Sequence, residues 1–228
     1  MNDSLNPSFS RNFLFDKVVQ NKDLVEEDTQ SDAGSISGAA EVNVLRIFDS
    51  FQSAFRPEEM RCLALVAHNN MKPAMKAFVQ NRQEVLKKFR LTGTSTTMTM
   101  LRSIFDSDKD VMYGPTFKSG PLGGDAEVCA LMCQEDLGGI LFFMDPLDPH
   151  PHQCDIDSMI RLCNVKNVLY ATNPTSCSAI TSILEKALKE GRKDMIPSFF
   201  ESLKSPSVSV YEEENKYWLQ YFNESENK

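Results

Sequence analysis

The sequence has little of several features that would assign it at once to a common class. It has no excess of positive charge: 24 Lys and Arg face 32 Asp and Glu, for a net charge of -8 and a pI near 5.0. We therefore expect no nucleic-acid partner, because a polyanion gains nothing from an acidic surface. With 41% hydrophobic and 25% charged residues, the chain is also too polar for a membrane span. Any phosphate site must therefore consist of a small cluster of residues and not of a broadly basic surface.

Cysteine motifs and leader patterns are also missing. The six cysteines lie mostly within apolar segments, and no two have CxxC spacing. This pattern is typical of buried thiols in a reducing compartment, so no disulfide framework is expected. The first residues contain no basic stretch followed by an apolar run, and they lack the Arg-rich, acid-poor character of a transit peptide. These features together predict a cytoplasmic protein.

What the sequence does have, from Arg61 onward, is a regular alternation of short apolar runs and helical patterns. The predicted strands are CLALVA (62–67), FRLT (89–92), VMYGPTFK (111–118), GILFFM (139–144) and VLYAT (168–172). The predicted helices span 73–89, 97–105, 126–133, 156–163 and 178–188. Strands separated by helices predict βαβ units. The expected fold class is α/β: a doubly wound, mainly parallel five-stranded sheet with helices on both faces.

The two ends of the chain differ in composition from this middle part. Residues 1–40 are acidic and hold few large apolar side chains, which predicts a disordered arm. Apolar residues at helical spacing predict a short amphipathic helix over 41–57. The α/β domain is expected over 58–195. A partly helical extension is expected over 196–228, where tyrosines and one tryptophan interrupt an acidic run.

Four short polar clusters each follow an apolar run. They are AHNNMK (67–72), TGTST (92–96), SGPLGGD (119–125) and DPLDPHPHQCD (145–155). Loops at the carboxyl ends of parallel strands meet in one crevice, so these segments can build a single site for an anionic ligand. This arrangement argues for an enzyme.

Two of the clusters can hold a phosphate. TGTST follows a strand and precedes a helix, whose free N–H groups and dipole attract an anion. The alternative is that Thr94 or Ser95 only caps the helix. Lys72 adds a cation just before Pro73, a residue that favours the first turn of a helix. A solvated surface lysine is the alternative there, and the nearby His68 argues against it.

SGPLGGD is the sharpest signal among the four. Its glycines let the backbone approach a ligand closely, and the turn places Asp125 at the start of a helix. A carboxylate at that position is ordinarily an N-cap with a lowered pKa. A bound phosphate would raise the pKa of Asp125 again and make it a better base. On these residues alone, a helix cap and a catalytic base both remain open.

The fourth cluster contains four side chains that can bind a metal: His150, His152, Cys154 and Asp155. Its proline-rich spacing and the lack of a second Cys or His cluster argue against a closed tetrahedral site, so we expect no metal. The other interpretation is a histidine that polarises or shuttles protons at a substrate oxygen, oriented by a carboxylate. Asp145 is expected only to cap or brace the loop.

These clusters, in this order, resemble the methylglyoxal synthases over about 64–179. The matching segments are ALVAHNNMK, LTGTST, SGPLGGD, FFMDPL with PHQCDID, MIRLCNV and YATNPTS. The resemblance implies a lyase that converts dihydroxyacetone phosphate to methylglyoxal and inorganic phosphate through an enediolate, without a metal or redox cofactor. It implies that Asp125 accepts the proton and that Asp155 is a second catalytic carboxylate. From the chemistry of this reaction, we expect His152 to polarise the substrate oxygens and Asp155 to orient this network. The implied substrate-binding residues are His68, Lys72, Thr92, Gly93, Thr94, Ser95, Ser119, Gly120 and His152.

This sequence differs from the family pattern at several positions near the clusters. Asn69 stands where the family commonly has Asp, and Ala126-Glu127 stands in place of two glutamines. Ser95 replaces a Thr and keeps the hydroxyl. The family also implies a homo-oligomer, commonly a hexamer, with inorganic phosphate as an allosteric inhibitor.

Two other functions are compatible with part of this pattern. The same kind of domain resembles the regulatory, effector-binding domain of carbamoyl phosphate synthetase, which has no reason to keep a base and a proton shuttle. The presence of Asp125, His152 and Asp155 therefore favours the enzyme. An isomerase of triose phosphates would form the same enediolate but would have to retain the phosphate behind a closing lid.

Overall fold

The computed structural model describes residues 51–148 and 150–226, with side chains as far as residue 221. The chain divides into two units between residues 45 and 46, and the described residues all belong to the second. The arm expected over 1–40 and most of the helix expected over 41–57 lie outside the described residues. Residues 51–56 form no helix, and the short 3-10 helix η2 (Pro57–Glu59) leads into the first strand.

Five parallel strands form one sheet in the order β3-β2-β1-β4-β5. The strands are β1 (Cys62–Ala67), β2 (Arg90–Thr94), β3 (Met112–Phe117), β4 (Leu137–Phe143) and β5 (Leu169–Ala171). The predicted α/β class is therefore confirmed. From β1 the chain adds strands in one direction to β3, and then returns to add β4 and β5 on the other side. The strand order reverses between β1 and β4, which is where ligands bind in open parallel sheets.

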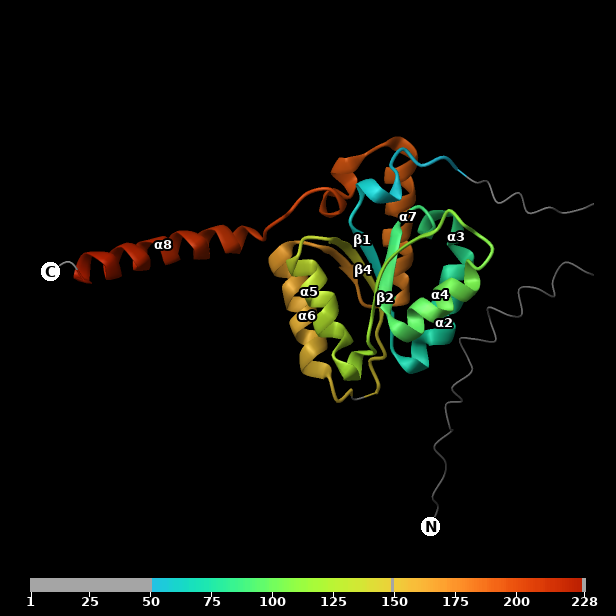
Figure 1. Cartoon of the computed structure of the whole chain (residues 1–228), viewed down its shortest axis with the longest axis horizontal. Coiled ribbons are helices and arrows are strands. Elements are labelled where there is room, and N and C mark those ends of the chain that lie inside the picture. The colour runs from blue at the N-terminus through green and yellow to red at the C-terminus, as the bar shows by residue number, and fades with distance from the viewer. Residues whose placement is uncertain (1–50, 149, 227–228) are drawn as a thin grey trace, which may run out of the picture. The chain divides into compact units, whose positions relative to one another are not determined.

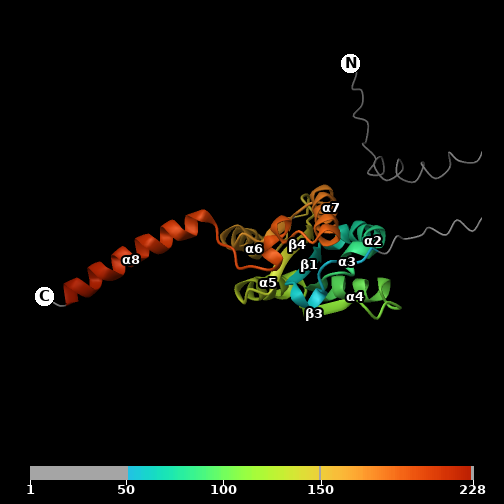
Figure 2. The ribbon, with the colours of Figure 1, turned by 90° about the horizontal axis from the view of Figure 1, so that it is seen from above.

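Helices cover both faces of the sheet (Figures 1 and 2). One face carries α2 (Lys72–Asn81), α3 (Gln83–Leu86), α4 (Ser95–Ile104) and α7 (Pro174–Glu190). The other face carries α5 (Gly124–Cys133) and α6 (Gln153–Lys166). The remaining short 3-10 segments are η3 (Asn69–Met71), η4 (Gly120–Leu122), η5 (Lys193–Met195) and η6 (Pro197–Phe199).

The helix expected over 73–89 is two helices, because the chain breaks at Arg82, where φ is -120°. A straight helix would place Arg82 on the same stripe as Met75, Phe78 and Val79, which are buried. Burying a guanidinium among apolar side chains is costly. The break keeps Arg82 half-buried, and α3 still turns Leu86 into the core.

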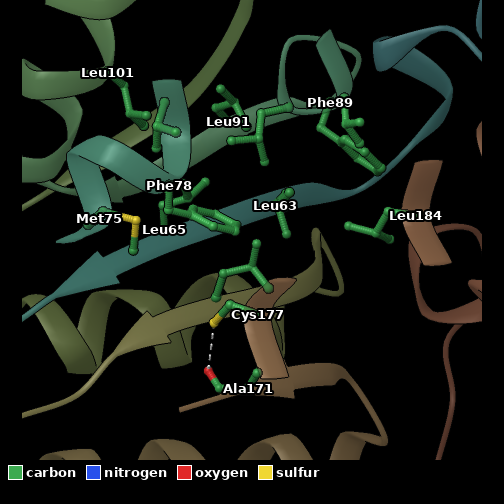
Figure 3. Packing of buried hydrophobic residues seen from close by; sticks show 14 of the residues in the cluster. Leu63, Leu65, Met75, Phe78, Phe89, Leu91, Leu101, Ala171, Cys177 and Leu184 are labelled. Carbon is green, nitrogen blue, oxygen red and sulfur yellow. Dashed lines mark hydrogen bonds between the residues drawn. The ribbon is translucent and has the colours of Figure 1, made fainter. Parts of the chain in front are cut away.

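The core lies on the two faces of the sheet because successive side chains of a strand point to opposite sides. Leu63 and Leu65 of β1 pack toward Phe78 on the face shown in Figure 3, whereas Ala64 and Val66 pack under α5 and α6. A fully buried leucine stabilises the fold by roughly 2 kcal/mol. The rigid sheet therefore fixes where the loops at its carboxyl edge begin.

The packed core continues beyond residue 195. Phe199 of η6 is fully buried against Gly138 of β4, and the hydroxyl of Ser198 donates to the Gly138 carbonyl (2.7 Å). The chain then forms α8 (Pro206–Glu226), which is exposed at every described side chain except Val208. Within the described part of the chain, no helix is both long enough and apolar enough to cross a membrane.

Candidate active site

A pocket of about 350 Å³ opens at the carboxyl edge of the sheet, next to the point where the strand order reverses. All four polar clusters contribute to its wall. The lining residues are Val66, Ala67, His68, Asn69, Lys72, Thr94, Thr96, Ser119, Gly120, Pro121, Asp125, Phe142, Asp148, His150 and His152. Segments more than 80 residues apart in the sequence thus meet in one crevice.

Asp125 and His152 form a buried pair in this pocket. Only 2% of Asp125 and 8% of His152 is exposed, and Nδ1 of His152 lies 2.7 Å from Oδ2 of Asp125. Because an ionised carboxylate can only accept, the ring N–H at Nδ1 is the donor. The two residues meet because Asp125 lies in the first turn of α5, His152 immediately precedes α6, and these helices pack side by side. Burial raises the pKa of Asp125, although the His152 bond acts in the opposite direction. A carboxylate with a raised pKa is a better base.

Gly120 lies directly against this pair. A Cβ at that position would come within 2.5 Å of Cε1 of His152 and 3.1 Å of Oδ2 of Asp125. Any side chain there would displace the ring or the carboxylate. The close backbone approach expected from the SGPLGGD cluster is therefore an approach to the Asp125–His152 pair.

A second histidine, His68, is fixed in one tautomer. The backbone N–H of Asp145 donates to its Nδ1 (3.0 Å), so in the neutral ring the proton is on Nε2. Nε2 is buried and has no hydrogen-bond partner among the described residues. Burial, with added repulsion from His150 and His152, lowers the pKa of His68 to about 4. At neutral pH His68 is thus an uncharged donor in the pocket wall.

The loop after β4 is braced against the loop after β1. One oxygen of Asp145 accepts the N–H of Leu147 (3.0 Å), and the other accepts the side-chain amide of Asn70 (2.9 Å). These bonds lower the pKa of Asp145. Asp145 has the bracing role that the sequence predicts, and the brace holds its backbone N–H against the ring of His68.

A cation and several hydroxyl groups also line the pocket. Lys72 begins α2, and its Nζ donates to Oδ1 of Asn69 (2.6 Å). Because Asn69 is neutral, this contact leaves the charge of Lys72 available to an anion. Thr94 ends β2, and Thr96 and Ser119 also line the pocket. One positive charge and three hydroxyls are a suitable set for a phosphate.

The three histidines of the pocket place one ring nitrogen each within 4.8 Å of the others. The ring centroids of His68 and His150, however, are only 3.5 Å apart. Two imidazoles on one tetrahedral metal, with bonds of about 2.0–2.1 Å, would have centroids about 5 Å apart. Nδ1 of His68 also accepts a hydrogen bond from the Asp145 N–H, and Nε2 carries the proton of the neutral ring. Neither nitrogen of His68 therefore has a free lone pair for a metal. The cluster in this arrangement does not fit a metal ion.

No family model matches the chain, but curated relatives do. The methylglyoxal synthase of Treponema socranskii is 39% identical over 123 residues, which cover 54% of this chain and 78% of that protein. The chain belongs to the methylglyoxal synthase family. The enzyme of Rhizobium etli is 35% identical over 125 residues, covering 55% and 96%. A crystal structure of methylglyoxal synthase from Elizabethkingia anophelis NUHP1 is 33% identical, covers 54% of this chain and 78% of that chain, and has a TM-score of 0.47.

The pocket unites seven of the residues that the resemblance to methylglyoxal synthases implies. They are His68, Lys72, Thr94, Ser119, Gly120, Asp125 and His152. Two others of the TGTST cluster lie deeper. Thr92 is fully buried and its hydroxyl donates to the Pro115 carbonyl, which joins β2 to β3. Gly93 has no room for a side chain, because a Cβ would lie 2.1 Å from the Leu65 carbonyl oxygen.

The last two implied residues lie at the start of helices, outside the pocket wall. Ser95 is the first residue of α4 and its carbonyl accepts the hydroxyl of Thr99 (3.0 Å). Asp155 is exposed in the first turn of α6. Its negative charge nevertheless contributes to the raised pKa of Asp125. The side chain of Asp155 makes no hydrogen bond to His152 or Asp125 in the described part of the chain, so the expected orienting role is not seen, and Asp155 acts on the pocket through its charge.

Sequence reasoning assigned no substrate role to four other polar residues of the wall: Asn69, Thr96, Asp148 and His150. All four belong to the polar clusters, so position in a cluster was the available signal. The side of the loop on which each would lie could not be derived from spacing alone.

Proposed function

We propose that this protein is a methylglyoxal synthase, a lyase that converts dihydroxyacetone phosphate to methylglyoxal and inorganic phosphate. The observation that carries the proposal is the buried Asp125–His152 pair in a pocket that also holds Lys72. A domain that only binds an effector needs the cation but has no use for a buried carboxylate with a raised pKa. Membership of the methylglyoxal synthase family supports the same conclusion.

The chemistry determines which proton the base removes. Phosphate can leave only from the carbon next to the enediolate, so Asp125 takes its proton from the hydroxymethyl carbon of dihydroxyacetone phosphate. When the enediol hydroxyl then loses its proton, electrons move toward the phosphate-bearing carbon. The C–O bond breaks, and phosphate leaves with the electron pair. The resulting enol of methylglyoxal takes up a proton on that carbon, which becomes the methyl group.

The tautomers of the two histidines suit different steps. His68 offers a fixed Nε2–H to the carbonyl oxygen, where negative charge develops as the enediolate forms. His152 directs its Nδ1 proton at Asp125, so the lone pair on Nε2 of the neutral ring can accept the enediol hydroxyl proton. One ring thus stabilises the oxyanion and the other carries a proton away from the substrate.

The proposed phosphate subsite consists of Lys72, Thr94, Thr96 and Ser119. Their charge and hydroxyls hold the phosphate of the substrate and stabilise it as a leaving group. Burial is the main cause of the raised pKa of Asp125, and the negative charge of Asp155, outside the wall, adds to it.

An assay with dihydroxyacetone phosphate tests the proposal directly. Purified protein is expected to release methylglyoxal and inorganic phosphate in equal amounts, measured by trapping the dicarbonyl and by a phosphate assay. Formation of glyceraldehyde phosphate without free phosphate would identify an isomerase instead. Binding of phosphate with no turnover of the substrate would favour an effector-binding module.

Membership of the same family supports a proposal about the assembly and setting of the protein. We propose a cytoplasmic homo-oligomer that is inhibited allosterically by inorganic phosphate and does not bind nucleic acid or membranes. Light scattering after gel filtration is expected to give a mass six times the 25.7 kDa of one chain. Phosphate is expected to make the dependence of rate on substrate sigmoidal. A monomeric mass would contradict the proposed assembly.

A further inference from the structure

His150 packs on His68 although the resemblance assigns it no role. The two ring centroids are 3.5 Å apart and the rings are tilted by 42°. His150 is half-buried, lines the pocket and lies two residues before His152. The ring of Phe142 also contacts His68 in a T-shaped arrangement, with the ring centroids 4.8 Å apart. His68 is thus enclosed by rings from β4 and from the loop that follows it.

We propose that His150 is a positioning residue: by stacking on His68 it keeps water from that ring and holds it as a neutral Nε2–H donor. This inference rests on the proposed function for its meaning in catalysis. Two contacts support the positioning role independently of catalysis: the packing of the His150 ring on the His68 ring, and the hydrogen bond from the Asp145 N–H to His68.

The bond to Asp145 explains why the neutral form matters. Protonation of His68 would place a hydrogen on Nδ1, which faces the Asp145 N–H at 3.0 Å. Two N–H groups would then point at each other, and the bond that fixes the ring would be lost. A neutral His68 keeps both its anchor and its donor, whereas a protonated His68 loses the anchor.

The charges near His68 act on its pKa in both directions. Asp145 and Asp148 on the same loop favour the protonated ring, and His150 and His152 oppose it. Among the other titratable groups of the pocket, Lys72 is on α2 and Asp125, on α5, is engaged by His152. Burial is the largest cause of the lowered pKa of His68. His150 contributes both to this burial and to the repulsion, so its removal acts on both.

Two variants separate the stack from its charge. His150→Ala removes the covering ring, whereas His150→Phe keeps an aromatic ring and removes the titratable nitrogens. NMR titration of the His68 ring in wild type is expected to give a pKa near 4. In His150→Ala we expect it to move toward the ordinary value of about 6.5. In His150→Phe it should stay well below that value. This measurement requires no turnover.

The same shift predicts a change in the pH profile. A His68 pKa of about 6.5 leaves roughly one quarter of the molecules with a neutral ring at pH 6. If the His68 pKa returns fully to about 6.5, kcat/KM of His150→Ala should fall about fourfold more than that of wild type between pH 8 and pH 6, and a partial return should give a smaller fall. Taking the ratio to wild type cancels the titration of the substrate phosphate. His150→Phe should follow wild type more closely.

Four results would overturn the inference. One is an unchanged His68 pKa in His150→Ala. Another is an equal loss of kcat/KM at every pH, because His150 would then act on the substrate directly. The third is a His150→Phe variant that melts like wild type but titrates like His150→Ala. Stoichiometric Zn²⁺ binding to wild type that is lost in His150→Ala would make the pair metal ligands. If wild type forms no methylglyoxal while the NMR shifts occur as expected, the proposed function fails and the stacking role stands.

Discussion

Asp125→Asn is expected to lower kcat by on the order of 10³-fold or more while the fold and phosphate binding persist. The amide oxygen of Asn can still accept the Nδ1–H of His152, so the pair should remain in place. The amide, however, has no basicity with which to remove a carbon-bound proton. Phosphate release measures turnover, calorimetry with inorganic phosphate measures the anion subsite, and thermal melting reports the fold.

A matched control removes the same charge from a neighbouring surface. Asp157 is exposed on α6, where Oδ1 accepts the side-chain amide of Gln153 (2.9 Å), and it does not line the pocket. Asp157→Asn should therefore leave kcat within about twofold of wild type, since isolated surface charges have small effects. An Asp125→Asn enzyme with more than a tenth of wild-type activity would remove Asp125 from the role of base.

The fold could be predicted from the sequence because buried parallel strands are continuous apolar runs. CLALVA is such a run, and all six of its residues are buried. The weak third strand, interrupted by Gly114 and Pro115, is explained by its place at the edge of the sheet, where proline is tolerated. The break at Arg82 was missed because helical periodicity continues through it. Only burial of the same stripe makes an arginine there unfavourable.

The positions of the polar clusters could be predicted because each follows an apolar run that forms a buried strand. The contacts that their side chains make could not be predicted. Thr92 and Thr94 are two residues apart in TGTST, yet Thr92 is sealed between strands and Thr94 lies at the pocket. The bond from Asp145 to His68 joins residues 77 apart and depends on β4 lying beside β1. The alternation of strands and helices in the sequence does not reveal that strand order, so the tautomer of His68 emerges only from the structure.

His68→Asn is expected to lower kcat by about 10²- to 10³-fold, the loss typical for one oxyanion donor. Its side-chain oxygen would lie near the position of Nδ1, so the N–H of Asp145 keeps an acceptor. No donor would reach the position of Nε2. His68→Gln is the matched variant, because its amide N–H₂ reaches approximately to Nε2 while the Asp145 acceptor is lost.

Comparing the two variants determines which nitrogen of His68 serves catalysis. If the Nε2–H donor stabilises the enediolate, His68→Gln should retain at least tenfold more activity than His68→Asn, although its melting temperature should be the lower of the two. A carbon-bound proton that exchanges with solvent more slowly in His68→Asn would locate the defect at enediolate formation. The reverse order of activities would show that the anchor at Nδ1, and not the donor at Nε2, is what the reaction requires.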